Sequence, residues 1–355
     1  MLKFLEPKKY PIAGIDISNG SLKVMQLKKM NDHYVIQHYA HEPLAPNIMA
    51  NKEIKNPQAL ADALYNLFSK SKIETRHVAF ALSGNAVVTR VIQLDTSLHG
   101  REILSQIEAE SDKYLPYPFD QLNLDYQILR PQSSRGPNLM DVQIAAVRSE
   151  YLQVFLDVMK LANLVPKIVE IESFSIERAF NLISHFLPNK GKNVKVALID
   201  IGGQITTMHV FLNGEIIYSK EQNFGGGQLT EQIQRRYSLS YEEALSAQIN
   251  QSLPDDYIHE ILEPFKELIA QQIHRAIQLY YSSEQESLID YIALAGGTVN
   301  VMGLDESISQ LTSTKTYIVN PCVDMVLEPN LNLSDIALEG PKLLICTGLA
   351  MRGIE

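Results

Sequence analysis

Two aspartates each stand near the end of a predicted strand and are followed at once by small residues. Asp16 is the last residue but one of the apolar run 12–17, and Asp200 ends the run 194–200. A tight turn lets backbone N–H groups approach phosphates, hydroxyl groups add donors, and a carboxylate can hold a hydrated metal ion. These residue types therefore predict a polyphosphate site in which Asp16 and Asp200 hold Mg²⁺ through water.

Each of these turns offers further candidate ligands. The candidate phosphate-binding residues are Asp16, Ser18, Gly20 and Ser21 in the first loop and Asp200, Gly202, Gly203, Thr206 and Thr207 in the second. A third turn, Gly296-Gly297, follows the predicted strand 291–295 and could let an adenine approach the backbone closely. One such turn is usually an ordinary connection, but three of them in this order favour a shared ligand site.

The elements that would position these loops occur twice in the chain. An apolar strand, a terminal Asp, a small-residue turn and a second strand occupy 12–27 and again 196–212. A chain of 355 residues is long enough for two or three domains. We therefore predict an α/β protein made of two related halves, 1–190 and 191–355.

The first half is interrupted by a block with its own pattern of helices and strands. From about residue 96 a helix, two strands around a polar loop and a helix beginning after the cap Ser149 follow one another. This pattern predicts an inserted α+β subdomain at about 96–164, with the core of the first half at about 1–95 and 165–190. In the second half, helices are expected at about 227–237, 240–250, 258–281 and 341–352.

The composition excludes several classes of function. A net charge of −10 argues against nucleic acid as a partner, because phosphate neutralisation needs a basic face. Cys322 and Cys346 are the two cysteines, too few for a disulfide framework or a four-thiol zinc site. The sequence contains neither a Walker-type Gly-x-x-x-x-Gly-Lys-Ser/Thr run nor a Gly-x-Ser-x-Gly nucleophile motif. With no run near the length of a membrane helix, we expect a cytoplasmic chain without a membrane span.

Several longer segments carry a family resemblance. They are 14–23, 113–119, 124–129, 200–207, 224–230, 295–297 and 347–353. Together they resemble the actin-like ATPase superfamily and, within it, the PilM family of type IV pilus assembly proteins, relatives of the division protein FtsA. The segment Lys-Tyr-Leu-Pro-Tyr-Pro-Phe at 113–119 is the most discriminating, because sugar kinases and chaperones of the superfamily lack it.

The resemblance implies a fold and a set of ligand contacts. The fold would be an actin-like ATPase fold with two duplicated, ribonuclease H-like halves. The first half would carry an inserted 1C subdomain, and the second a helical 2B subdomain at about 228–288, with the last helix packing back on the first half. ATP or ADP with Mg²⁺ would occupy the cleft between the halves. By position, Lys23 joins the first phosphate loop, Gly296 and Gly297 form the adenosine loop, and Gly225, Gly226 and Gly227 lie by the phosphates at a helix start.

The resemblance also implies a partner. Such a protein is peripheral to the inner membrane and binds the N-terminal cytoplasmic tail of a PilN-like membrane protein beside the 1A and 1C subdomains. It would link that protein to other pilus machinery proteins on the motor side. Alternatives are an active ATPase, a small-molecule kinase or an FtsA-like protein that self-associates into filaments.

Three residues depart from the pattern of relatives. Ser18 stands where relatives usually have Gly, and Leu245 and Gln248 stand where they usually have Glu and Lys that hold the nucleoside. The lost contacts would weaken nucleotide binding, and no general base can be identified from the sequence. We therefore expect at most a weak ATPase.

Overall fold

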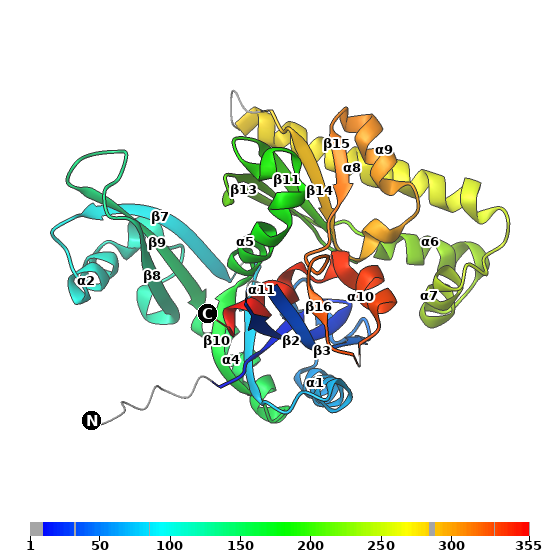
Figure 1. Ribbon diagram of the computed structural model, residues 1–355, viewed down its shortest axis with the longest axis horizontal. Coiled ribbons are helices and arrows are strands. Elements are labelled where there is room, and N and C mark those ends of the chain that lie inside the picture. The colour runs from blue at the N-terminus through cyan, green and yellow to red at the C-terminus, as the bar shows by residue number, and fades with distance from the viewer. Residues whose placement is uncertain (1–9, 32, 85, 284–287, 330, 355) are drawn as a thin grey trace.

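Two mixed β-sheets form the framework of the computed structural model, which describes residues 10–31, 33–84, 86–283, 288–329 and 331–354 (Figure 1). The first is built from the first half except for its edge strand β16, which comes from residues 326–327, and the second is built from the second half. The first sheet has six strands in the order β10-β6-β1-β2-β3-β16. The second has five in the order β13-β12-β11-β14-β15.

The two sheets repeat one topology, as the sequence predicts. In each, the first strand pairs antiparallel with the strand that follows it and parallel with a later strand that returns after a helical crossover. The corresponding strands are β1 (Ala13–Ile17), β2 (Ser21–Met30) and β6 (His77–Leu82) in the first sheet and β11 (Lys195–Ile201), β12 (Thr206–Leu212) and β14 (Tyr291–Ala295) in the second. The remaining strands of the two sheets are β3 (His33–Pro43), β10 (Val165–Ile171), β13 (Glu215–Gln222), β15 (Lys315–Ile318) and β16 (Val326–Leu327).

The crossover helix of the first half illustrates how local sequence sets the elements. Helix α1 (Pro57–Ser71) has Pro57 at its first position, and the Asn56 side chain accepts a hydrogen bond from the N–H of Ala59. Leu60 and Leu64 lie on its apolar face and are buried against the first sheet. The predicted cap and apolar face of this helix are confirmed.

A separate three-stranded sheet, in the order β7-β9-β8, projects from the first half and is seen at the left of Figure 1. It has its own apolar cluster, which joins the sheet to the short helices beside it. Its elements are β7 (Val87–Asp95), α2 (Arg101–Ala109), α3 (Ser111–Tyr114), β8 (Leu122–Arg130) and β9 (Leu139–Arg148).

The limits of this insertion differ from the predicted 96–164. The strand β7, expected in the core, pairs along its whole length with β9. The helix α4 (Ser149–Leu161), expected in the insertion, buries Phe155 and Val158 in the apolar cluster of the first sheet. The inserted unit therefore extends from about 87 to 148. The predicted limits differ because strand and helix periodicity identify a buried face but not the sheet that covers it. Ser149 is the first residue of α4 rather than its cap.

Three helices of the second half lie between β13 and β14 in the chain. They are α6 (Gly227–Tyr237), α7 (Tyr241–Ile249) and α8 (Glu263–Ser283), and α9 (Leu304–Thr312) and α10 (Leu333–Glu339) follow later. A π-helical turn, Ile258–Leu262, runs directly into α8, so Pro264 lies inside a continuous helical segment, immediately after the π turn and near the start of α8.

The last helix, α11 (Leu344–Arg352), packs on the first half. A Cβ at Gly14 of β1 would lie 2.4 Å from the N atom of Ala350, and one at Gly348 would lie 1.9 Å from the carbonyl oxygen of Ser175. Glycine at both positions permits this close approach between α11, β1 and α5 (Glu172–Ile183). None of the helices in the described ranges is long and apolar enough to cross a bilayer.

Candidate functional site

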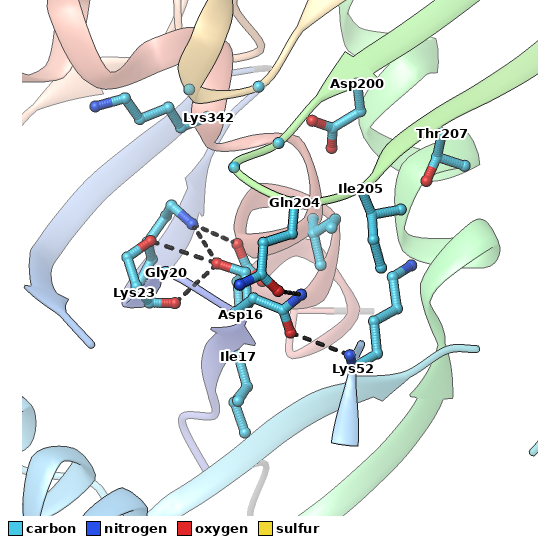
Figure 2. Close-up of a pocket in the computed structure, with 18 of the residues that line it drawn as sticks. Asp16, Ile17, Gly20, Lys23, Lys52, Asp200, Gln204, Ile205, Thr207 and Lys342 are labelled. Atoms are coloured by element: carbon cyan, nitrogen blue, oxygen red, sulfur yellow. Dashed lines mark hydrogen bonds and ion pairs between the residues drawn. The ribbon is translucent and has the colours of Figure 1, made fainter. Parts of the chain in front are cut away.

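A cavity of about 170 Å³ lies between the two halves, where β1 and β11 end (Figure 2). Both predicted loops and the Gly296-Gly297 turn line it. The predicted residues found in its wall are Asp16, Ser18, Gly20, Ser21, Lys23, Asp200, Gly202, Gly203, Thr207, Gly296 and Gly297. Residues that are nearly 300 positions apart in the chain therefore share one site.

Asp16 and Lys23 form a buried ion pair in the wall of this cavity. They lie directly opposite each other across the β1–β2 ladder, and Nζ of Lys23 is 2.8 Å from Oδ2 of Asp16. Burial alone would lower the pKa of Lys23, but the attraction of the Asp16 carboxylate and its hydrogen bond outweigh this effect and raise the pKa. Lys23 thus neutralises Asp16 at the first loop.

Asp200 has no such cation bonded to it among the described residues and lies close to two other carboxylates. Burial, followed by repulsion from Glu172 and Asp16, raises the pKa of Asp200 to about 6. A divalent cation held through water by Asp200 and Asp16 would relieve this repulsion, and carboxylate oxygens are the ligands that Mg²⁺ prefers. The donor set therefore fits a hydrated Mg²⁺. No group of three or more His, Cys, Asp or Glu residues in the described ranges could hold a metal ion by itself.

The second loop is held from behind by the start of α6. The carbonyl oxygen of Gly202 accepts hydrogen bonds from the N–H of Gly226 at 2.9 Å and from Oγ1 of Thr298 at 3.1 Å, and the carbonyl oxygen of Gly203 accepts one from the N–H of Gly227 at 2.7 Å. The described residues contain no cis peptide bond. In a planar trans peptide the following N–H points away from the carbonyl. The N–H groups of Gly203 and Gln204 therefore point away from α6, an arrangement that suits an anion.

Four of the residues expected beside a ligand do not line the cavity. Gly225, Gly226 and Gly227 lie behind the second loop, and the N–H groups of the last two are bonded to its carbonyls. A Cβ at Gly225 would lie 2.3 Å from the carbonyl oxygen of Gly202, so glycine is needed here for packing. Thr206 is buried and donates to the carbonyl oxygen of Phe224 at 2.9 Å, because neighbouring strand residues face opposite sides and Thr207 faces the cavity.

Of the three residues that depart from the pattern of relatives, Ser18 lies in the cavity wall, and Leu245 and Gln248 lie outside it. Oγ of Ser18 donates to the carbonyl oxygen of Ser21 at 2.8 Å, so this hydroxyl is bound within its own loop. Leu245 and Gln248 belong to α7, which contributes no residue to the cavity wall. Oε1 of Gln248 is buried without a hydrogen-bond partner among the described residues.

The sequence did not predict the polar residues at the mouth of the cavity. Nζ of Lys52 lies 3.1 Å from Oε1 of Glu172 and 2.7 Å from Oε1 of Glu221. Its backbone N–H donates to Oδ1 of Asn19 at 3.0 Å, and Nδ2 of Asn19 donates to Oε1 of Gln204 at 2.9 Å (Figure 2). Lys52 follows β4 (Met49–Ala50) in a short turn with no recognisable motif, so only the fold brings it to the site. Lys342 is a further residue of the wall that no motif indicated.

The family model described as type IV pilus assembly protein PilM matches residues 14–354. The chain belongs to the PilM family. A solved structure described as a PilM-PilN type IV pilus biogenesis complex is 22% identical, with 98% of this chain and 99% of that chain covered and a TM-score of 0.81. The PilM-family chain is therefore a type IV pilus assembly protein, as its sequence motifs predicted.

Two other solved structures share the fold of this PilM-family chain. The ethanolamine utilization protein EutJ from Carboxydothermus hydrogenoformans is 15% identical, with coverage of 98% and 90% and a TM-score of 0.57. MreB 5 of Spiroplasma citri bound to AMPPNP is 12% identical, with coverage of 98% and 96% and a TM-score of 0.50. These likenesses confirm the predicted actin-like ATPase fold.

Proposed function

We propose that this chain is a nucleotide-binding scaffold of type IV pilus assembly. It holds ATP or ADP with Mg²⁺ in the cavity between its halves and binds the N-terminal cytoplasmic tail of a PilN-like inner-membrane protein. Through that tail it is peripheral to the inner membrane on the cytoplasmic side. The observation that carries the proposal is the joint cavity of two Asp-ended loops in a member of the PilM family.

The chemistry of the cavity supports nucleotide binding. The N–H groups of the second loop suit phosphate oxygens, and the carboxylates of Asp16 and Asp200 suit a hydrated Mg²⁺. When bound, the cation would neutralise phosphate charge beside these carboxylates. The fold supports the same ligand class, since MreB 5 with AMPPNP is similar over 98% of this chain.

The partner site is proposed at the outer edge of the first sheet. Among the strands of the described ranges β10 pairs with β6 alone, so its other edge offers backbone groups to which an extended peptide can add as a further strand. Val165 and Val169 of β10 are 43% and 41% exposed and offer apolar contacts. The projecting three-stranded sheet leaves the body of the molecule beside β10 and α4 (Figure 1). A peptide along this edge would lie between the first core and the insertion.

Calorimetric titration with a peptide from the N-terminal tail of the PilN-like partner tests the partner site. We expect Val169→Lys to weaken binding at least tenfold, because it places a charge on the apolar contact. The matched control is Val326→Lys on β16, the strand at the opposite edge of the same sheet, where Val326 is 52% exposed. Equal effects of the two variants, or no binding by the unaltered chain with or without MgATP, would contradict the site.

Slow ATP hydrolysis is the second candidate function. Asp200 favours it, because a buried carboxylate whose pKa lies near 6 is suited to accept a proton from water. The scaffold function predicts that phosphate release from ATP is no faster than in Asp200→Asn. Release well above that control would support an ATPase.

A further inference from the structure

Lys342 lies across the end of the cavity formed by the Gly296-Gly297 turn. It belongs to the short turn Gly340–Lys342 that leads into α11. A Cβ at Gly297 would lie 3.7, 3.9 and 4.0 Å from Cε, Cδ and Cγ of Lys342. The alkyl stem of Lys342 therefore covers the face of Gly297 that would otherwise be open to a flat ligand group.

Two contacts fix Lys342 in this position. The N–H of Gly296 donates to the carbonyl oxygen of Pro341 at 2.8 Å, which ties the backbone of one turn to that of the other. Nζ of Lys342 is 2.7 Å from Oε1 of Glu339, and both side chains are partly buried. In Figure 2 the ammonium end of Lys342 points away from Asp200, so the stem rather than the charge faces the glycine turn.

The rest of the wall suits a phosphate chain better than a base. Ligand pockets for drug-sized molecules span about 300–1,000 Å³ and are mainly apolar and aromatic. This cavity, of about 170 Å³, is smaller, and none of the described residues in its wall is aromatic. Its apolar side chains are Ile17, Ile205 and Ile345, and the other wall residues are charged, polar or glycine. Loop amides, lysines and carboxylates with a metal ion are the groups that bind phosphates.

From these observations we propose that Lys342 is a specificity-determining residue that shields the glycine turn from the nucleobase. The cavity then selects the polyphosphate chain of its ligand and does not discriminate between bases. This inference rests on the proposed binding of nucleotide in the same cavity. It assigns the ligand class as a magnesium-bound di- or triphosphate, with or without a nucleoside.

Calorimetric titrations with MgATP, MgGTP and magnesium tripolyphosphate test the inference. For the unaltered chain we expect the three dissociation constants to agree within threefold. Lys342→Ala uncovers Gly297 and is expected to bind MgATP at least tenfold more tightly than tripolyphosphate. Lys342→Met keeps the alkyl stem without the charge, and the three ligands should remain within threefold of one another. Thermal unfolding of both variants verifies that they are folded.

Three results would overturn the inference. The first is that the unaltered chain binds MgATP more than tenfold more tightly than tripolyphosphate. The second is that Lys342→Ala leaves the ratio of the dissociation constants for tripolyphosphate and MgATP unchanged. The third is that Lys342→Met changes this ratio as much as Lys342→Ala does. Each of these outcomes leaves nucleotide binding itself intact. If none of the three ligands binds at millimolar concentration, both this inference and the proposed nucleotide site fail.

Discussion

Asn19 of the first loop donates a 2.9 Å hydrogen bond to Gln204 of the second loop and so joins the two halves across the mouth of the cavity. Lys52 makes a second connection, since its ammonium group bonds Glu221 of the second half as well as Glu172 of the first. Both connections involve polar side chains that are far apart in the chain. They hold the loops in register around the cavity.

The two partners of Lys52 differ in burial, and this difference predicts unequal effects on stability. Lys52→Met would leave the carboxylate of Glu172, which is only 19% exposed, without its cation, at a cost of about 2–4 kcal/mol. Glu221 is 41% exposed, so Glu221→Gln should cost less than about 1 kcal/mol. Urea denaturation measures both free energies of unfolding. The double variant Lys52→Met/Glu172→Gln should recover most of the loss, and equal costs for the two single variants would refute this role.

Two glycine positions of the cavity wall differ in whether they can accept a side chain. Gly296 has φ of +96°, and a Cβ there would lie 2.3 Å from Oδ1 of Asp200 and 2.5 Å from the carbonyl oxygen of Ile201. Gly296→Ala should therefore lower the free energy of unfolding by about 1–3 kcal/mol. A Cβ at Gly203 would meet nothing within 4 Å, so Gly203→Ala is the matched control and should stay within about 0.5 kcal/mol. Similar denaturation midpoints for the two variants would show that the close contact at Gly296 is absent.

The raised pKa of Asp200 predicts how stability depends on pH. The folded chain keeps the proton of Asp200 up to about pH 6, whereas an unfolded aspartate loses it near pH 4. Between these values the folded state binds more protons, so this group makes stability fall as the pH rises. Asp200→Asn should therefore be more stable than the unaltered chain at pH 7 but not at pH 4. Urea midpoints at the two pH values measure this, and a constant difference would rule out the shift.

The lowered pKa of His209 predicts the opposite dependence of stability on pH. Burial lowers its pKa to about 4, whereas an unfolded histidine titrates near 6.5. Between these values the unfolded state binds more protons, so this group makes stability rise with pH and its contribution is lost on acidification. His209→Gln should reduce the loss of stability between pH 6.5 and pH 4 in urea denaturation. A loss as large as in the unaltered chain would exclude His209 as its source.

Binding of Mg²⁺ at Asp200 should compete with its proton. The additional affinity that Mg²⁺ gives to ATP is expected to be full above about pH 6 and to decline as the pH falls through that value. Titrations of ATP with and without Mg²⁺ at pH 5 and pH 7.5 measure this difference, with Asp200→Asn as the control that lacks the titrating group. A Mg²⁺ effect of equal size at both pH values would place the metal elsewhere.

Much of the fold follows from local sequence, because the motif of strand, aspartate and turn occurs twice. The same local pattern places Asp16 and Asp200 at corresponding strand ends, and the cavity contains both. The sequence did not predict to which sheet an element belongs where that depends on the surface against which the element packs. The helix α4 has a clear apolar face, yet its periodicity cannot say that this face covers the first sheet rather than the insertion.

Lys52 and Lys342 were not predicted at the site for the same physical reason, because contacts between distant segments place them there. Lys52 reaches Glu221 across 169 positions, and Lys342 lies against Gly297 through a contact between two separate turns of the second half. The glycines 225–227 were expected beside the phosphates at a helix start, but they lie behind the second loop and do not line the cavity. Sequence shows that these residues permit close approach and does not show which backbone approaches them.

Crystallisation of the chain with MgATP tests the central claim most directly. The structure predicts phosphate density between Asp16 and Asp200, with phosphate oxygens within hydrogen-bond distance of the N–H groups of Gly203 and Gln204. An empty cavity at saturating MgATP, or phosphates bound outside these two loops, would contradict it.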